Sequence, residues 1–330
     1  MERELALEFV RVTEGAALAA APWMGRGDKE AIDGAAVETM RALFDNVDID
    51  GTVVIGEGEM DEAPMLYIGE RLGTGRGPRV DVAVDPVEGT NLVARGLPDA
   101  IAVVAVAPRG TLLHAPDMYM QKIAVGPEAA GKVDIDAPPA ENVRRVAKAL
   151  GKEVSQVTVI LLDRPRHEQI VRQVREVGAR IRFISDGDVL AALATALPES
   201  GVDLLLGIGG APEGVLAAAA LRCLGGELQA RLLPQDDQEA ARCQAMGIRD
   251  PGQVLTMHEL VRGDDVIFSA TGITPGSLLR GVRFARNGAE TETLVMRAWT
   301  GTVRRVRAFH HPERKPVLRD LPAFRRPASA

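Results

Sequence analysis

The chain of 330 residues has only two cysteines, Cys223 and Cys243, and no long run of apolar residues. Two isolated cysteines provide no metal-ligand spacing and indicate a reducing compartment. Without an apolar run of about 18 residues, no segment is expected to span a membrane. The start, MERELALEFV, is acidic and helical rather than basic and then apolar. We therefore expect no signal peptide and a cytoplasmic location.

Positive charge is also scarce relative to negative charge. The 39 lysines and arginines face 46 aspartates and glutamates, which gives a net charge of -7. This balance weighs against a nucleic-acid partner and suits a protein that binds cations. The hydrophobic share of 46% and charged share of 26% are typical of a soluble globular protein. The length allows one large domain or two closely packed ones.

The pattern of apolar residues changes near residue 140. The earlier part predicts two helices and then strands that we expect to form an antiparallel set, the helices over 2–20 and 28–46 and the strands over 52–59, 80–85, 100–108 and 118–126. The segment 132–142, with paired prolines, reads as a linker. The later part predicts strands that each precede a helix: 157–163 before 167–177, 180–185 before 189–197, and 202–210 before 213–224. Further strands are expected near 265–270 and 291–306.

Strands that alternate with helices imply a parallel sheet with right-handed crossovers. The fold class is therefore α/β, with an α+β first half and a parallel or mixed sheet in the second half. We place the halves at 1–140, which would bind metal, and 141–330, which would bind substrate. The active site is expected at their junction.

The stretch VDVAVDPVEGTNL, residues 80–92, begins as an alternating strand and ends in acidic residues. Asp85 precedes a proline and should stay extended. Glu88 and Thr90 follow in a tight turn, where Gly89 gives the backbone freedom and Thr90 could cap a helix. Two carboxylates held this rigidly suit a hard cation such as Mg²⁺ or Mn²⁺. An acidic turn with a helix cap explains the spacing equally well.

Other acidic residues favour the metal interpretation. Glu57 lies in a Gly-Glu-Gly turn after a strand, and Asp61 follows at the next turn. Asp33 shares a helix face with Val37 and Met40, and a carboxylate at the head of an apolar stripe is costly unless it is paired or bound to metal. A solvated turn for Glu57 and a basic partner for Asp33 remain open as alternatives.

The loops after the three later strands share one sheet edge, where open α/β sheets bind ligands. They read DRPRH (163–167), SDGDV (185–189) and GIGGAPEG (207–214). Arg164 and Arg166 suit a phosphate, because a guanidinium forks onto its oxygens. Surface arginines are common, however, and the second loop also resembles a plain turn with a helix cap.

The remaining loop residues suggest sugar and anion contacts. Asp186 and Asp188 could accept hydrogen bonds from sugar hydroxyls, and glycines before a helix leave backbone N–H groups exposed. His167 reads as a helix-start residue rather than a ligand. Pro212 replaces the third glycine of a dinucleotide fingerprint, which argues against a nicotinamide dehydrogenase.

Taken in order, seven segments resemble the class II fructose-1,6-bisphosphatases of bacteria, in the lithium-sensitive sugar-phosphatase superfamily. These segments are GRGDKEAID, VVIGEGEMDEAPML, VDPVEGTN, DRPRH, SDGDV, GIGGAPEGV and VMRAWTGTVR. The resemblance covers about residues 5–310 and implies a layered αβαβα sugar-phosphatase fold. Other superfamily members usually have aspartate where Glu88 stands.

The resemblance assigns the site residue by residue. It implies metal ligands at Asp33, Glu57, Asp85, Glu88 and Glu213. It implies substrate contacts at Glu88, Gly89, Thr90, Tyr119, Arg164, Pro165, Arg166, Asp186, Gly187, Asp188 and Gly210. It also implies that Thr90 orients or deprotonates the attacking water, with Glu57 or Asp61 drawing the proton onward.

The implied function is hydrolysis of fructose 1,6-bisphosphate to fructose 6-phosphate and phosphate, a gluconeogenic step. The cofactor would be Mg²⁺ or Mn²⁺, more than one ion per site, and the chain would form a homo-oligomer, a dimer or tetramer, without nucleic-acid or membrane partners. Rival interpretations are a related phosphatase acting on inositol phosphates or sedoheptulose 1,7-bisphosphate, and a non-catalytic sugar-phosphate sensor.

Overall fold

The computed structural model describes residues 1, 4–56, 66–315 and 317. The chain divides into two compact units. Unit 1 comprises Met1–Arg109, Ile267–Arg297 and Thr302–Ala330, and unit 2 comprises Gly110–Val266 and Ala298–Gly301. In the part of the chain that is described, no helix has the length and apolar character needed to cross a membrane.

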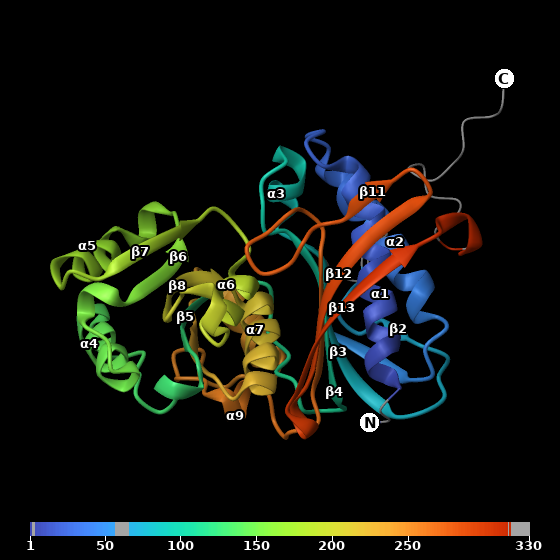
Figure 1. The fold of residues 1–330 in the computed structure, drawn as a ribbon. Coiled ribbons are helices and arrows are strands. Elements are labelled where there is room, and N and C mark those ends of the chain that lie inside the picture. Colours follow the sequence, from blue (N-terminus) through green and yellow to red (C-terminus); the bar gives the residue numbers. More distant parts are fainter. Residues whose placement is uncertain (2–3, 57–65, 316, 318–330) are drawn as a thin grey trace. The chain divides into compact units, whose positions relative to one another are not determined.

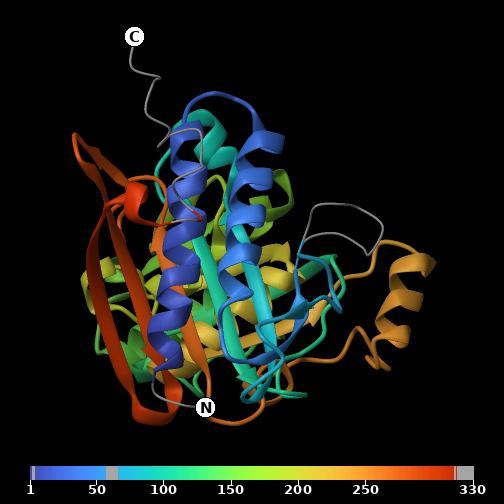
Figure 2. The same cartoon turned by 90° about the vertical axis from the view of Figure 1, so that its right-hand side faces the viewer.

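Unit 1 begins with two helices, α1 (Leu5–Ala20) and α2 (Lys29–Phe44), which lie side by side on one face of a sheet (Figures 1 and 2). The Asp28 carboxylate starts α2 by accepting the Ala31 N–H at 3.0 Å. Phe9 of α1 and Phe44 of α2 are fully buried and their rings pack 6.4 Å apart. This core fixes α2, and with it the position of Asp33, against the sheet.

The sheet of unit 1 is mixed, in the order β11-β12-β10-β4-β3-β1-β2, with β13 paired to β12. Its strands are β1 (Asp50–Ile55), β2 (Arg71–Leu72), β3 (Arg79–Glu88), β4 (Ile101–Pro108), β10 (Ile267–Gly272), β11 (Arg283–Ala285), β12 (Gly288–Arg297) and β13 (Thr302–His310). The short helices are η1 (Ala21–Trp23), α3 (Thr90–Arg95) and η7 (Pro312–Arg314). Strand β3 is parallel to β1 and antiparallel to β4.

A buried polar chain joins α1 to the sheet of unit 1. Lys315 Nζ donates to His310 Nδ1 at 2.6 Å, so the ring proton of His310 is on Nε2. Nε2 donates to the Thr291 hydroxyl at 2.8 Å. Thr291 donates in turn to Glu14 Oε1 at 3.2 Å. Burial raises the pKa of Glu14 and lowers the pKa of His310 to about 4. His310 is therefore neutral in the folded chain near pH 7.

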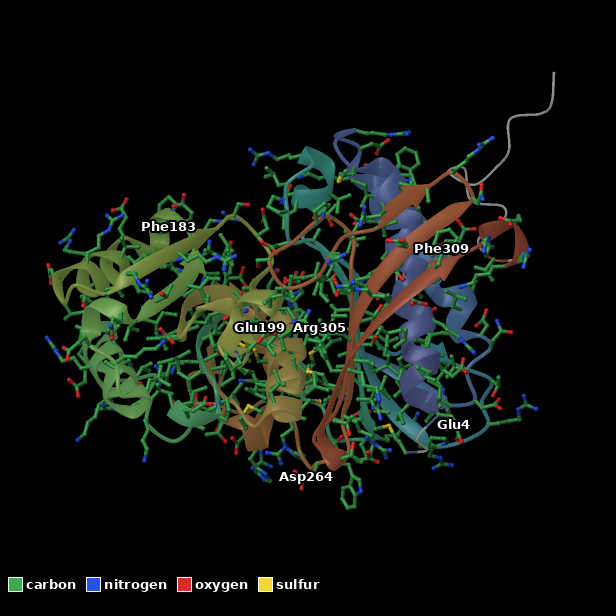
Figure 3. All side chains as sticks on the ribbon, in the orientation of Figure 1. Glu4, Phe183, Glu199, Asp264, Arg305 and Phe309 are labelled. Carbon is green, nitrogen blue, oxygen red and sulfur yellow. The ribbon has the colours of Figure 1, made fainter. Side chains whose placement is uncertain are left out.

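Unit 2 contains a five-stranded sheet in the order β7-β6-β8-β5-β9. Its strands are β5 (Tyr119–Val125), β6 (Thr158–Leu162), β7 (Arg180–Ile184), β8 (Leu204–Gly210) and β9 (Glu227–Leu232). Its helices are η2 (Pro127–Ala129), α4 (Pro139–Leu150), η3 (Val154–Gln156), η4 (Pro165–His167), α5 (Glu168–Glu176), α6 (Asp188–Ala194), η5 (Pro198–Ser200), α7 (Ala211–Leu224), α8 (Asp237–Ala245), α9 (Met257–Leu260) and η6 (Ala298–Thr300). Phe183 of edge strand β7 remains 41% exposed (Figure 3).

The structure is α/β, as predicted, and it corrects three details of the expected arrangement. The parallel sheet is confirmed where β6 pairs with β7 and β8. The expected antiparallel set is wrong in two places, because β1 and β3 are parallel and β5 belongs to the sheet of unit 2. The predicted linker 132–142 runs into α4, whose first residue is Pro139.

The late strands also join the first sheet. Strand β10 pairs with β4 from Ile267 opposite Val106 to Gly272 opposite Ile101. The sheet of unit 1 therefore takes strands from both sides of the boundary near residue 140. The halves 1–140 and 141–330 remain a prediction about domains.

Candidate functional site

Strand β3 ends in a bulge that places its last two acidic residues, Asp85 and Glu88, on one face. Asp85 lies opposite Val103 of β4, and Glu88 lies opposite Ile101, so three steps along β3 match two steps along β4. The extra residue changes the alternation of side chains. Asp85 and Glu88 therefore share the sheet face opposite α1 and α2, although their odd spacing in a regular strand would separate them. The Asp85 carboxylate accepts the Val87 N–H at 3.0 Å, which fixes the bend.

Gly89 and Thr90 connect this strand end to α2. Gly89 has φ +91°, a conformation that only glycine adopts readily, and it precedes the first residue of α3. The Thr90 hydroxyl does not cap α3, as the sequence allowed. It donates to Asp33 Oδ1 at 2.8 Å and lies 3.2 Å from the Val87 carbonyl. Burial raises the pKa of Asp33, and the Thr90 hydrogen bond opposes this effect.

Asp33 occupies the position that its spacing predicts. Val37, Met40 and Phe44 on the same face of α2 are buried, and Asp33 is half-buried at the head of this stripe. Among the described residues, its carboxylate accepts a hydrogen bond from the Thr90 hydroxyl, and the Lys29 ammonium lowers its pKa electrostatically. The pair joins residues 57 positions apart in the chain, which spacing alone could not reveal.

The predicted metal ligands are only partly placed. Asp33, Asp85 and Glu88 belong to unit 1 and Glu213 to unit 2, whereas Glu57 lies outside the described residues, as does Asp61, the second predicted proton acceptor. Among the residues that are described, no group of three or more metal-binding side chains comes together. The metal assignment therefore stays a prediction that rests on the donor chemistry.

The arginine loop of unit 2 follows β6, and Pro165 begins the short helix η4 there. Arg164 donates to Asp186 Oδ1 at 3.1 Å. Arg166 donates through Nε and Nη2 to the Ile208 carbonyl at 3.2 and 2.8 Å, and its guanidinium lies 4.8 Å from the centre of the Tyr119 ring. Arg164 thus connects the loop after β6 to the loop after β7. Arg166 connects the same loop to β8 and β5.

His167 connects this loop to the sheet. Its Nδ1 lies 2.7 Å from the Leu162 carbonyl, and its Nε2 accepts the Ile208 N–H at 2.9 Å. The ring is therefore the neutral Nδ1–H tautomer, and burial lowers its pKa. The sequence predicts a helix-start residue, and His167 does stand directly before α5. Its link between the ends of β6 and β8 was missed.

A buried charge cluster lies where β8 meets α7. Lys122 of β5 forms an ion pair with Asp188 Oδ2 and donates to the Gly210 carbonyl at 2.9 Å. Gly187 has φ +84° and precedes Asp188, the first residue of α6. Burial raises the pKa of Glu213, the nearby Asp188 carboxylate raises it further, and the Lys122 ammonium opposes both effects.

The last two glycines of β8, Gly209 and Gly210, leave space for these carboxylates. A Cβ at Gly209 would lie 2.1 Å from Asp188 Oδ2, and a Cβ at Gly210 would lie 2.0 Å from Glu213 Oε2. Both distances are far below van der Waals contact, so side chains at these positions would displace the carboxylates. The glycine pair predicted to expose backbone N–H groups also has this second, steric role.

Comparison with known proteins places the chain in a family. Residues 3–310 match the model of bacterial fructose-1,6-bisphosphatase, glpX-encoded. The curated fructose-1,6-bisphosphatase 1 class 2 of Escherichia coli K12 is 53% identical over 328 residues, covering 96% of this chain and 97% of that protein. The fructose-1,6-bisphosphatase class 2 of Shigella flexneri shows the same identity and coverage. The chain belongs to the bacterial class 2 fructose-1,6-bisphosphatase family.

Proposed function

We propose that this chain hydrolyses fructose 1,6-bisphosphate to fructose 6-phosphate and phosphate, a gluconeogenic reaction. The observation that carries the proposal is the 53% identity to curated class 2 enzymes over 96% of the chain. The site geometry agrees with this activity, because the chain presents a hydroxyl–carboxylate pair in unit 1 and an arginine loop in unit 2.

The Thr90–Asp33 pair supports a route for the proton of the attacking water. The water gives a proton to Thr90 Oγ1 while Thr90 gives its own proton to Asp33 Oδ1, the acceptor 2.8 Å away. The hydroxide attacks phosphorus, the P–O bond to the sugar breaks, and the sugar oxygen takes up a proton from a solvent water and leaves. A threonine hydroxyl is a poor base alone and needs such an acidic neighbour. The sequence assigned this role to Glu57 or Asp61, which lie outside the described residues; among the residues that are described, the acceptor of the Thr90 proton is Asp33.

The cofactor we propose is Mg²⁺ or Mn²⁺, held by Asp33, Glu57, Asp85, Glu88 and Glu213. The donor chemistry fits, because all are carboxylates and hard cations prefer oxygen ligands. Burial and the Asp188 carboxylate raise the pKa of Glu213, and a bound cation would oppose both effects. When bound, the metal neutralises phosphate oxygens and lowers the pKa of water. Such help is needed, since this hydrolysis requires roughly 20 kcal/mol of barrier reduction.

We further propose that the phosphate that is not cleaved binds at the arginine loop. Arg164 and Arg166 are held by carbonyl and carboxylate oxygens, yet a guanidinium has five N–H donors and both keep some for an anion. Asp186 and Asp188 would contact sugar hydroxyls, and Gly89, Gly187 and Gly210 would allow close approach of the substrate.

Four finer assignments complete the proposal. We assign the chain to the lithium-sensitive sugar-phosphatase superfamily and to its layered αβαβα fold. We also expect a homo-oligomer, a dimer or tetramer, in the cytoplasm. That the residues of the two units act on one substrate stays a prediction.

The test is phosphate release by the purified chain with Mn²⁺ or Mg²⁺. Fructose 1,6-bisphosphate is compared with inositol 1-phosphate and sedoheptulose 1,7-bisphosphate, and Asp85→Asn serves as the variant. Asparagine keeps an oxygen that can accept the Val87 N–H but removes the charge. We expect turnover of fructose 1,6-bisphosphate that Asp85→Asn abolishes. No turnover by the parent would refute the proposal, and preference for another substrate would replace it.

A further inference from the structure

Lys122 is not among the site residues that the sequence predicts. It lies in the middle of β5, opposite Gly207 of β8 and Ala230 of β9, and it is 3% exposed. An ammonium group at such a position loses its hydration, and this cost is offset only by close polar partners. Asp188 Oδ2 and the Gly210 carbonyl supply them.

The Asp188 carboxylate is held asymmetrically by this contact. Oδ2 pairs with Lys122, whereas Oδ1 is buried and has no hydrogen-bond partner among the described residues. A buried carboxylate oxygen without a donor is unfavourable, so such an atom calls for a donor from a ligand. The hydroxyl groups of a sugar phosphate are donors of this kind.

The surrounding backbone has the shape that this arrangement requires. A Cβ at Gly209 would lie 2.1 Å from Asp188 Oδ2 and 3.0 Å from Lys122 Nζ. A Cβ at Gly214, in α7, would lie 3.4 Å from Lys122 Cδ. Glycine at 209 thus leaves room for the Asp188 carboxylate beside the Lys122 ammonium, whereas the 3.4 Å distance from Gly214 is ordinary van der Waals contact with the lysine stem.

We propose that Lys122 is a positioning residue for sugar recognition. Its ammonium holds Asp188 through Oδ2 so that Oδ1 is directed at a substrate hydroxyl. This inference rests on the proposed function, because the hydroxyl donor belongs to the substrate.

The test compares Lys122→Met, Asp188→Asn and the double variant in steady-state phosphate release from fructose 1,6-bisphosphate. We expect Lys122→Met to raise KM at least tenfold with kcat changed less than fivefold, because the lost contact serves binding of the sugar. We expect the double variant to have the KM of Asp188→Asn within twofold, because Lys122 acts through Asp188. The double variant also lacks a buried unpaired charge and therefore keeps the test valid if Lys122→Met fails to fold.

A matched control is the ion pair of Lys152 with Asp203, 2.5 Å apart. Asp203 directly precedes β8, at the opposite end of the strand from Gly210. Lys152→Met should leave KM unchanged. Unchanged KM in Lys122→Met, a fall in kcat alone, or additive effects in the double variant would each overturn the inference. A parent enzyme that is inactive on fructose 1,6-bisphosphate would instead refute the proposed function.

Discussion

Replacement of Thr90 by valine tests the proton route most directly. Valine keeps the β-branched shape and removes only the hydroxyl that donates to Asp33 at 2.8 Å. A positioned proton-transfer group contributes about 10²- to 10⁴-fold, so kcat should fall by that factor. KM and the Mn²⁺ concentration for half-maximal activity should change little, because the hydroxyl is not required to hold substrate or cation.

The same substitution has a consequence for stability. The Thr90 hydrogen bond lowers the pKa of Asp33 against the effect of burial, so its loss raises that pKa further. The loss of a donor to a buried carboxylate costs about 1–3 kcal/mol. A carboxyl whose folded pKa lies above its unfolded pKa destabilises the fold as pH rises through this range. Thr90→Val should therefore lose stability at pH 7 and recover part of it at pH 4.

The assays are phosphate release with a Mn²⁺ titration, and urea unfolding at the two pH values. Thr90→Ser is the matched control, because serine keeps the hydroxyl and should retain activity within about tenfold. If kcat holds in Thr90→Val while the Mn²⁺ requirement rises, Thr90 is a ligand and the proton route is wrong.

Three further predictions concern the other elements of the structure. Alanine at Arg164 or Arg166 should raise KM for fructose 1,6-bisphosphate by roughly 10- to 150-fold, the equivalent of ~1.5–3 kcal/mol, and equal losses on a small monophosphate would place these arginines at the scissile phosphate. Gly210→Ala should raise the Mn²⁺ requirement, since its Cβ would displace the Glu213 carboxylate, and an unchanged requirement would contradict the metal assignment. The free energy of unfolding should decrease as pH falls from 6.5 to about 4, because buried His310 is protonated at a lower pH in the folded chain than in the unfolded chain. Urea unfolding of His310→Gln should show a flatter pH dependence than the parent, and identical curves would refute this assignment.

The end of β3, from Asp85 to Glu88, shows how much local pattern can predict. The alternation of apolar residues before Asp85 predicts a half-buried strand; the strand is present, but Asp81 and Ala83 on its second face are buried as well. The proline and glycine after Asp85 predict a sharp change of direction, which the structure contains at Gly89. The pattern could not predict the bulge that brings Asp85 and Glu88 to one face. A bulge is defined by the register with β4, which is a property of two strands.

Partners distant in the sequence explain the other misses. A lysine among apolar residues in MYMQKIAVG signals a buried ion pair, yet its partner Asp188 lies 66 positions further on, and no local rule connects them. Strands β10 to β13 likewise join the first sheet because β10 pairs with β4, which is far away in the chain. Elements with strong local periodicity were predictable, whereas pairings set by tertiary structure were not.

The two units hold their carboxylates with different partners, and this difference decides which kind of ligand each one suits. In unit 1, the half-buried Asp33 and Asp85 each accept a hydrogen bond from an uncharged donor, the Thr90 hydroxyl and the Val87 N–H, and the Lys29 ammonium lowers the pKa of Asp33 electrostatically. Neutral donors leave the negative charge in place, available to a cation. In unit 2, a fixed ammonium already balances one carboxylate, and the atom left over, Asp188 Oδ1, needs only a neutral hydrogen-bond donor. The first arrangement suits metal and phosphate chemistry, and the second suits recognition of an uncharged sugar hydroxyl.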